Sequence, residues 1–175
     1  VQGYNAQAAV TEDQVIVAAC LCQQEADWDL LHPMVELARD NLAAAGATGE
    51  IGEVVADAGY PSKANLELAE SPEISFYIAI KKDRLQAEDL KQSEVADESV
   101  PDGLNVFERM GHRLKTERGR KAYSKRGRTV EPVFGQIKNG RRTDRFMRRG
   151  LAACASEWSL MCTAHNLMKL FRWKA

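Results

Sequence analysis

The sequence predicts an α/β fold with a mixed sheet flanked by helices. Up to residue 80, strand-like and helical patterns follow one another in the order strand, strand, helix, strand, helix, strand. From residue 108 onward the pattern is helical. The 175 residues, of which 45% are hydrophobic, are enough for one ordinary domain with a core, and we expect this domain to cover residues 1–175.

The first two strands are expected to form a hairpin. Residues 5–10 are mildly apolar, residues 15–21 form a β-branched run, and four polar residues separate the two segments. Asp27 or Asp29 can cap the helix that follows, which reaches about residue 45 and carries a broad apolar stripe.

The next strand, residues 53–56, runs directly into Asp57-Ala58-Gly59-Tyr60. Ser62 then caps a short helix that reaches about residue 70, and residues 75–80 form the fourth strand. Residues 81–103 are acidic and nearly free of aromatic side chains, which indicates a solvated insertion, partly helical or disordered. The last helix, about 151–173, is strongly apolar and should pack on the sheet.

Charge is divided sharply along the chain. Residues 1–107 carry 20 acidic and 6 basic side chains, whereas residues 108–175 carry 5 acidic and 18 basic ones. A basic second half of this density indicates a polyanionic partner. The sequence contains no run of about 18 apolar residues, so we expect no membrane-spanning segment. It does not open on a basic-then-apolar signal segment. We expect the four cysteines to be reduced thiols of a cytoplasmic protein.

Two carboxylates are candidates for chemistry. Asp57 follows a strand at the sheet edge where open α/β folds bind ligands, although it could simply cap a turn. Glu131 precedes Pro132, so we expect it at a helix start, where the helix dipole favours an ionised carboxylate. There it could bind Mg²⁺ or Mn²⁺, or it could be a capping residue paired with Arg128.

Basic side chains surround the second carboxylate. Lys138 lies seven residues after Glu131, which places the two side chains on one helix face. Donors for phosphate oxygens precede and follow this helix, although any one arginine could be an ordinary surface charge. They are Tyr123, Arg126 and Arg128 upstream, and Arg141, Arg142, Arg145, Arg148 and Arg149 downstream.

Taken together, these motifs resemble the DDE transposases of bacterial insertion sequences, in the branch with a Tyr-Arg-Glu-Lys signature. The resemblance rests on residues 57–60 and 130–138, on the segment Gly3-Tyr4-Asn5-Ala6-Gln7-Ala8-Ala9-Val10, and on Arg149-Gly150-Leu151, Glu157-Trp158 and residues 165–170. It implies an RNase H-like fold with a five-stranded mixed sheet. It also implies phosphodiester cleavage and strand transfer on double-stranded DNA at a two-metal site, with Mg²⁺ or Mn²⁺.

By position, the resemblance makes Asp57 the second acidic metal ligand and Glu131 the third, with Tyr123, Arg126 and Lys138 holding the element's terminal DNA. The interval between Arg126 and Glu131 is one residue longer than in the usual signature, so Arg128 could take the place of Arg126. Arg141, Arg142 and Arg145 extend the DNA surface, and joining two element ends implies a homodimer acting at the bacterial nucleoid.

The family's first aspartate belongs on a strand upstream of residues 3–10, so we expect this chain to be a part of the catalytic domain that lacks its first strand and is inactive alone. Two other functions remain open. One is a different RNase H-like enzyme, such as a nuclease or resolvase. The other is a DNA-binding remnant without catalysis.

Overall fold

The structure is a computed structural model that describes residues 3–24 and 26–173. The chain divides into two compact units, which are described separately. Unit 1 draws on Val1–Glu25, Pro33–Thr48 and Gly127–Ala175, and unit 2 comprises Ala26–His32 and Gly49–Arg126. The boundary between the units falls inside helix α5 (Glu117–Gly135), between Arg126 and Gly127.

Unit 1 is built on the predicted hairpin. Strands β1 (Asn5–Val10) and β2 (Ile16–Cys22) pair antiparallel, from Asn5 opposite Cys22 to Val10 opposite Ile16, with a register shift at Ala9/Val10. Gln14 turns the chain with a positive φ of 65°, which is uncommon for a residue other than glycine. Helix α1 (Leu31–Ala44) is bonded to the hairpin through Asn41, whose amide donates to the carbonyl of Val17 at 2.8 Å.

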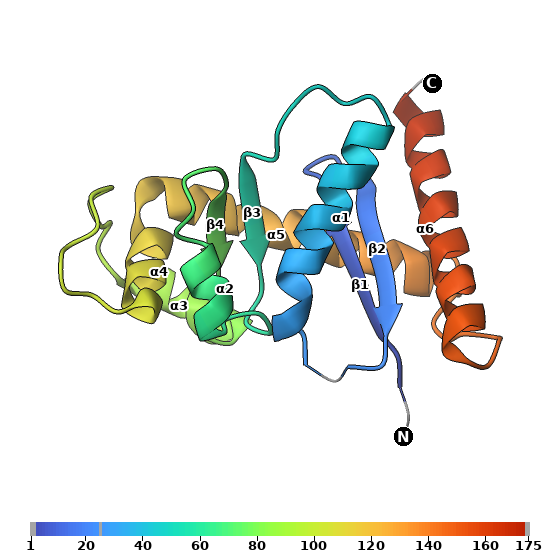
Figure 1. The fold of residues 1–175 in the computed structure, drawn as a ribbon, viewed down its shortest axis with the longest axis horizontal. Helices are drawn as coiled ribbons and strands as arrows, with labels where there is room; N and C mark the ends of the chain where they lie inside the picture. Colours follow the sequence, from blue (N-terminus) through green and yellow to red (C-terminus); the bar gives the residue numbers. More distant parts are fainter. Residues whose placement is uncertain (1–2, 25, 174–175) are drawn as a thin grey trace. The chain divides into compact units, whose positions relative to one another are not determined.

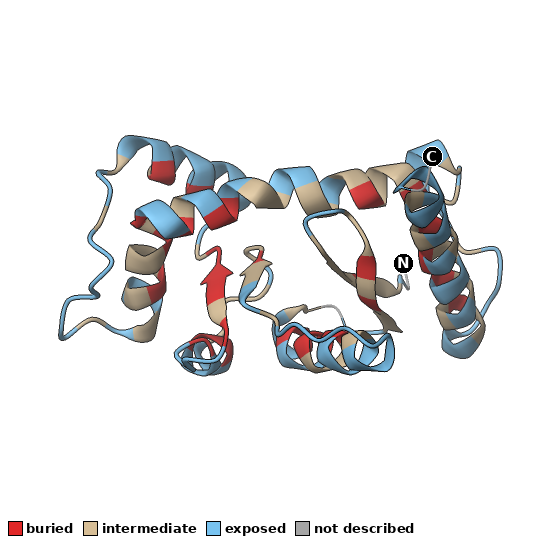
Figure 2. Cartoon of the chain, turned by 90° about the horizontal axis from the view of Figure 1, so that it is seen from above, coloured by how far each residue is buried: buried red, intermediate tan, exposed pale blue. Residues whose placement is uncertain are grey.

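Helix α6 (Leu151–Trp173) packs on the hairpin, as the sequence predicts (Figure 1). Ile16, Trp158 and Cys162 form a core with Val133 and Ile137, and the Trp158 ring stacks on Phe134 with centroids 5.8 Å apart. The Trp158 indole donates to the carbonyl of Gln7 at 3.1 Å. Buried residues recur along α6 between exposed ones (Figure 2), so one face of a long helix closes the core of unit 1.

Unit 2 is built on a parallel pair of strands. Strand β3 (Glu53–Ala56) pairs with β4 (Ser75–Ile78) in the register Glu53–Ser75 to Ala56–Ile78. Between them lie helix α2 (Lys63–Leu68) and its predicted cap, since the Ser62 hydroxyl accepts from the Asn65 N–H at 3.2 Å. Helix α4 (Val106–Lys115) packs on β4 and α2, and burial of apolar side chains on these elements stabilises the unit.

The acidic segment is more ordered than the sequence suggests. Helix α3 (Asp83–Gln92) occupies its first half, and Leu90 is buried there. The side-chain carbonyl of Gln86, itself 1% exposed, accepts the N–H groups of Ile80 and Lys81 at 3.2 and 3.3 Å. Asp89 pairs with Lys81 at 2.7 Å and with Lys115 at 3.6 Å. The segment is thus anchored by buried polar contacts that its composition does not reveal.

Sheet pairing differs from the prediction of one mixed sheet. The described residues form two separate two-stranded sheets, one antiparallel and one parallel. Both kinds of pairing are therefore present, but each is confined to its own unit. The residue pattern of a segment indicates whether it is a strand and which face is buried. It says little about which other strands it pairs with, especially for β3 and β4, which have only four residues each. Among the described residues, no helix has the length and apolarity needed to cross a bilayer.

Candidate functional site

Asp57 lies where the sequence places it, directly after β3 in unit 2. Its Oδ1 accepts the Gly59 N–H at 2.8 Å, which fixes the carboxylate over the turn. A Cβ on Gly59 would lie 2.6 Å from Asp27 Oδ2 and 3.0 Å from Asp57 Oδ1. Two carboxylates therefore lie against Gly59, and a side chain at this position would have to displace the Asp27 carboxylate.

Arg126 lies between two carboxylates of the same unit. Its Nη2 is 2.9 Å from Asp83 Oδ2 and 3.6 Å from Asp57 Oδ2, and its side chain is only 15% exposed. Although burial lowers the pKa of Arg126, the carboxylates of Asp83 and Asp57 outweigh it and raise that pKa overall. Arg126 therefore stays charged and brings a cation to Asp57.

Tyr123 belongs to the same cluster. Its hydroxyl donates to Asp83 Oδ1 at 3.3 Å, one turn of α5 before Arg126. Burial, followed by the charge of Asp83, raises the pKa of Tyr123 to about 12. The phenol therefore keeps its proton near neutral pH and remains a hydrogen-bond donor. The predicted phosphate donors Tyr123 and Arg126 thus lie together in unit 2, with Asp83 as their common partner.

Glu131 is not at a helix start, and this expectation from the sequence is wrong. Helix α5 continues to Gly135, so Glu131 and Pro132 lie inside it, close to its C-terminal end. The dipole there favours cations, so it does not stabilise the Glu131 carboxylate. The carboxylate is exposed, and both of its oxygens lie 4.0 Å from where a Cβ on Gly127 would be.

The reason α5 tolerates Pro132 is found in the hairpin turn of the same unit. Proline has no N–H, so the carbonyl of Arg128 cannot receive the usual helical bond from four residues on. The amide of Gln14 donates to that carbonyl instead, at 2.9 Å. The Gln14 Oε1 also accepts from Lys169 Nζ at 2.6 Å and from Gln136 Nε2 at 3.3 Å. Gln14 therefore links the turn, α5 and α6.

Lys138 lies in a π-helical turn, η2 (Gln136–Gly140), which interrupts the helix expected to carry it on the same face as Glu131. Because a π turn is wider than an α turn, the seven-residue spacing no longer places the two side chains directly in line. The Lys138 ammonium instead lies over the Phe134 ring, 5.6 Å from its centroid. Its side chain is exposed beside the core of unit 1.

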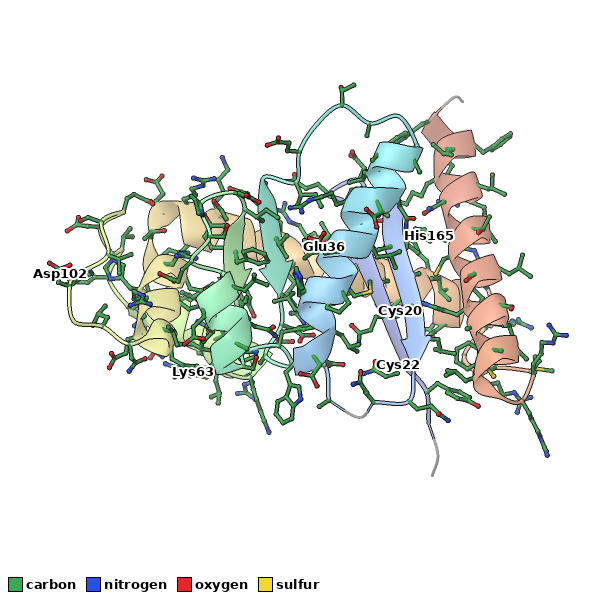
Figure 3. All side chains as sticks on the ribbon, viewed as in Figure 1. Cys20, Cys22, Glu36, Lys63, Asp102 and His165 are labelled. Carbon is green, nitrogen blue, oxygen red and sulfur yellow. The ribbon has the colours of Figure 1, made fainter. Side chains whose placement is uncertain are left out.

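The basic residues after η2 divide into two groups. Arg141 is half-buried, and its Nη1 contacts His165 Nδ1 at 3.3 Å, while His165 Nε2 contacts the carbonyl of Gln14 at 2.8 Å. Because Arg141 can only donate, this geometry fits a neutral His165 that accepts at Nδ1 and donates at Nε2. Figure 3 labels His165 beside α6. Arg142, Arg145, Arg148 and Arg149 are exposed in the loop before α6, and Arg128 is exposed on α5.

The donors around Asp57 have the chemistry that a divalent ion requires. Mg²⁺ prefers oxygen ligands and is commonly held by one or two carboxylates together with water and substrate phosphates. The carboxylates of Asp57 and Asp27 both lie close to Gly59, and two neighbouring carboxylates suit that mode of binding. Within residues 3–24 and 26–173, no group of three or more His, Cys, Asp or Glu side chains is arranged to hold a metal.

One comparison with known proteins gives a match. Residues 101–171 match a family model described as a transposase DDE domain, which supports a DDE transposase and a function related to transposition. The match covers about two fifths of the chain, from before α4 to the last turn of α6. It includes Tyr123, Arg126, Glu131 and Lys138, whereas Asp57 lies outside it. No curated protein and no solved structure matches the chain.

The sequence did not predict three residues of these clusters as site residues, namely Asp27, Asp83 and Gln14. Asp27 was expected only as a possible helix cap, yet it makes no side-chain cap bond to the turn Trp28–Leu30 (η1) that it precedes. Asp83 falls in the acidic segment, where nothing in its sequence neighbourhood distinguishes it. For Gln14 a partial signal exists, because a proline inside a helical pattern predicts a carbonyl that needs another donor.

Proposed function

We propose that this chain is part of the catalytic domain of a DDE transposase, with an RNase H-like fold, that cleaves and joins DNA at the ends of a bacterial insertion sequence. Asp57 and Glu131 are the proposed metal ligands, for Mg²⁺ or Mn²⁺ at a two-metal site. The proposed DNA contacts are Tyr123, Arg126, Arg128, Lys138, Arg141, Arg142 and Arg145. The active form would be a homodimer acting on double-stranded DNA in the bacterial cytoplasm.

One observation carries this proposal. The transposase match spans Tyr123, Arg126, Glu131 and Lys138, the four residues to which the family resemblance assigns the third metal ligand and the terminal-DNA contacts. The position of Arg126 supports it further, because this cation lies 3.6 Å from the Asp57 carboxylate within one unit. A cation beside a ligand carboxylate suits a substrate that brings negative phosphate to that carboxylate. This contact also favours Arg126 over Arg128 as the arginine of the signature.

The chain's own residues would act mainly by holding the phosphodiester. Arg126 and Tyr123 would donate to a non-bridging phosphate oxygen, with the Tyr123 proton retained because its pKa is about 12. The Gly59 N–H would hold the Asp57 carboxylate in its orientation. A bound divalent ion would polarise the phosphate and favour deprotonation of the attacking water or hydroxyl. Lys138 and the exposed arginines would bind the flanking backbone.

DNA binding by this chain tests the first half of the proposal. Binding constants for a short duplex should fall steeply with salt, by a log–log slope of about −0.9 for each phosphate neutralised. Replacing Arg142 and Arg145 by glutamine should make the slope shallower by up to about 0.9 for each residue. Arg84→Gln is a matched control, because Arg84 is 90% exposed on α3 and pairs with Glu88. An unchanged slope in the double variant would place the DNA surface elsewhere.

Catalysis tests the second half. The chain carries two of the three acids that the family resemblance implies, so we expect it to bind element-end DNA with Mg²⁺ or Mn²⁺ without nicking it. In a version extended upstream to include the first acid, Asp57→Asn and Glu131→Gln should each abolish cleavage and strand transfer while DNA binding is retained. Normal transposition by either variant would reject that residue as a ligand.

A DNA-binding protein without catalysis is the second candidate. It is favoured by the density of basic side chains in residues 108–175, where 18 basic residues accompany 5 acidic ones. Such a protein would show the salt-dependent binding described above, but its affinity would not respond to divalent ions and its extended version would not cut DNA. An RNase H-like nuclease would leave cut ends without strand-transfer joints, so product analysis separates it from a transposase.

A further inference from the structure

We propose that Asp83 is an internal phosphate mimic that occupies the DNA-phosphate donors Tyr123 and Arg126 and lowers their affinity for DNA. The inference rests on the proposed function, in which these donors receive a backbone phosphate. It gives the acidic α3 segment a regulatory role at that same site.

The geometry of Asp83 is that of a bound anion. One carboxylate oxygen accepts from the Tyr123 hydroxyl at 3.3 Å, and the other lies 2.9 Å from Arg126 Nη2. A phenol and a guanidinium that converge on two oxygens of one anion form a donor set that suits phosphate as well as carboxylate. A DNA phosphate and the Asp83 carboxylate would therefore compete for the same hydrogen bonds.

The contact can open without unfolding α3. The helix is held by the buried Gln86 and by the ion pairs of Asp89, neither of which involves Asp83. Arg120 adds further bonds, donating to the backbone carbonyls of Leu90, Ser93 and Glu94 at the C-terminal end of the helix. Asp83 begins α3 and its side chain is 50% exposed. Incoming DNA can thus displace its carboxylate while the helix stays in place.

The charge balance favours competition over joint binding. Arg126 already faces Asp57 as well as Asp83, so two carboxylates share one guanidinium. A phosphate added while Asp83 remains would bring a third negative group to that cation, and repulsion between the anions opposes this arrangement. The apparent DNA affinity is therefore reduced by the fraction of molecules in which Asp83 has released its donors.

A double-mutant cycle tests the proposal on the chain as it exists. Fluorescence anisotropy at fixed low salt would give the dissociation constant for a short duplex. Asp83→Asn should tighten binding by roughly two- to fivefold, the effect expected for loss of a partly exposed ion pair. In an Arg126→Gln background the same change should have almost no effect. If the Arg126→Gln variant does not fold, Tyr123→Phe provides a second background, because it keeps the packing of the ring and removes only the hydroxyl. In that background the gain in DNA affinity from Asp83→Asn should be smaller than in the wild type.

Glu88→Gln is the matched control. It removes one negative charge from the same helix, where Glu88 is 48% exposed and pairs with Arg84 at 2.9 Å. This variant should bind DNA like the wild type, because a single exposed charge away from Arg126 is largely screened by salt. A gain in Asp83→Asn alone therefore reports the contact rather than net charge.

The outcomes separate the two proposals. If wild type binds DNA and Asp83→Asn gains no more than Glu88→Gln, or if its gain persists without Arg126, the mimic is rejected and the proposed function stands. If neither wild type nor Asp83→Asn binds DNA at any salt concentration, the proposed function fails and the mimic with it. Binding by Asp83→Asn alone would support both.

Discussion

The contact between Gln14 and the Arg128 carbonyl leads to the sharpest test of the fold. Gln14→Met keeps the length of the side chain and the positive φ at this position, and removes three hydrogen bonds. A neutral bond contributes about 0.5–1.5 kcal/mol net and a bond to a charged group about 1.5–3 kcal/mol. Because water can reach this part of the turn, we expect a loss of about 2 kcal/mol of unfolding free energy.

Thermal unfolding is the assay, and a loss of this size lowers Tm by roughly 4–8 °C in a chain of this length. The decisive variant is Pro132→Ala, which restores the N–H that the Arg128 carbonyl lacks. In that background Gln14→Met should cost about 1 kcal/mol less, because the carbonyl then has a helical partner. Gln23→Met, which changes an exposed glutamine in the same unit, should leave Tm within about 1 °C.

Equal costs of Gln14→Met in the two backgrounds would refute the reasoning. Such additivity would mean that Gln14 stabilises the protein only through Lys169 and Gln136, and that α5 accommodates Pro132 by other means. A Gln14→Met variant as stable as the wild type would show that water replaces all three bonds at no cost.

The remaining predictions concern Gly59 and His165. Gly59→Ala should destabilise unit 2 by about 0.5–1 kcal/mol, because the added methyl would lie 2.6 Å from Asp27 Oδ2 and would displace that carboxylate, whereas Gly52→Ala meets nothing within 4 Å. Denaturant titration of both variants measures this cost, and equal midpoints would contradict the crowding argument. Burial, and then the charges of Arg141 and Lys169, lower the pKa of His165 despite its bond to the carbonyl of Gln14. The unfolded state therefore takes up a proton first as pH falls below about 6.5, so stability should decrease there, with little change above that pH. His165→Gln should flatten the Tm profile between about pH 7 and 5, and an unchanged profile would assign the titration to another group.

Much of the local structure was predictable because short-range patterns determine it. The hairpin, the strand before Asp57, the Ser62 cap and the length of α6 all follow from residues close together in sequence. Pairing was less predictable, since strand identity does not specify which edges meet. The expectation for Glu131 was wrong because proline was taken to start a helix, whereas a side chain from a distant turn lets the helix continue through it.

The candidate site was predictable in its residue types and less so in its partners. Tyr123 and Arg126 are one turn apart on α5, so their proximity follows from helical spacing. Their shared partner Asp83 is 40 residues from Tyr123 and 43 from Arg126, in a segment whose composition indicates solvated chain. The division of charge along the chain predicts a polyanionic partner for the basic half, and the transposase match agrees with that prediction. The same division gives no sign that an acidic side chain contacts Arg126. In the proposed mode of DNA binding, the acidic segment would supply the anion with which DNA competes. The affinity of Arg126 for phosphate would then depend on Asp83 as well as on the arginine itself.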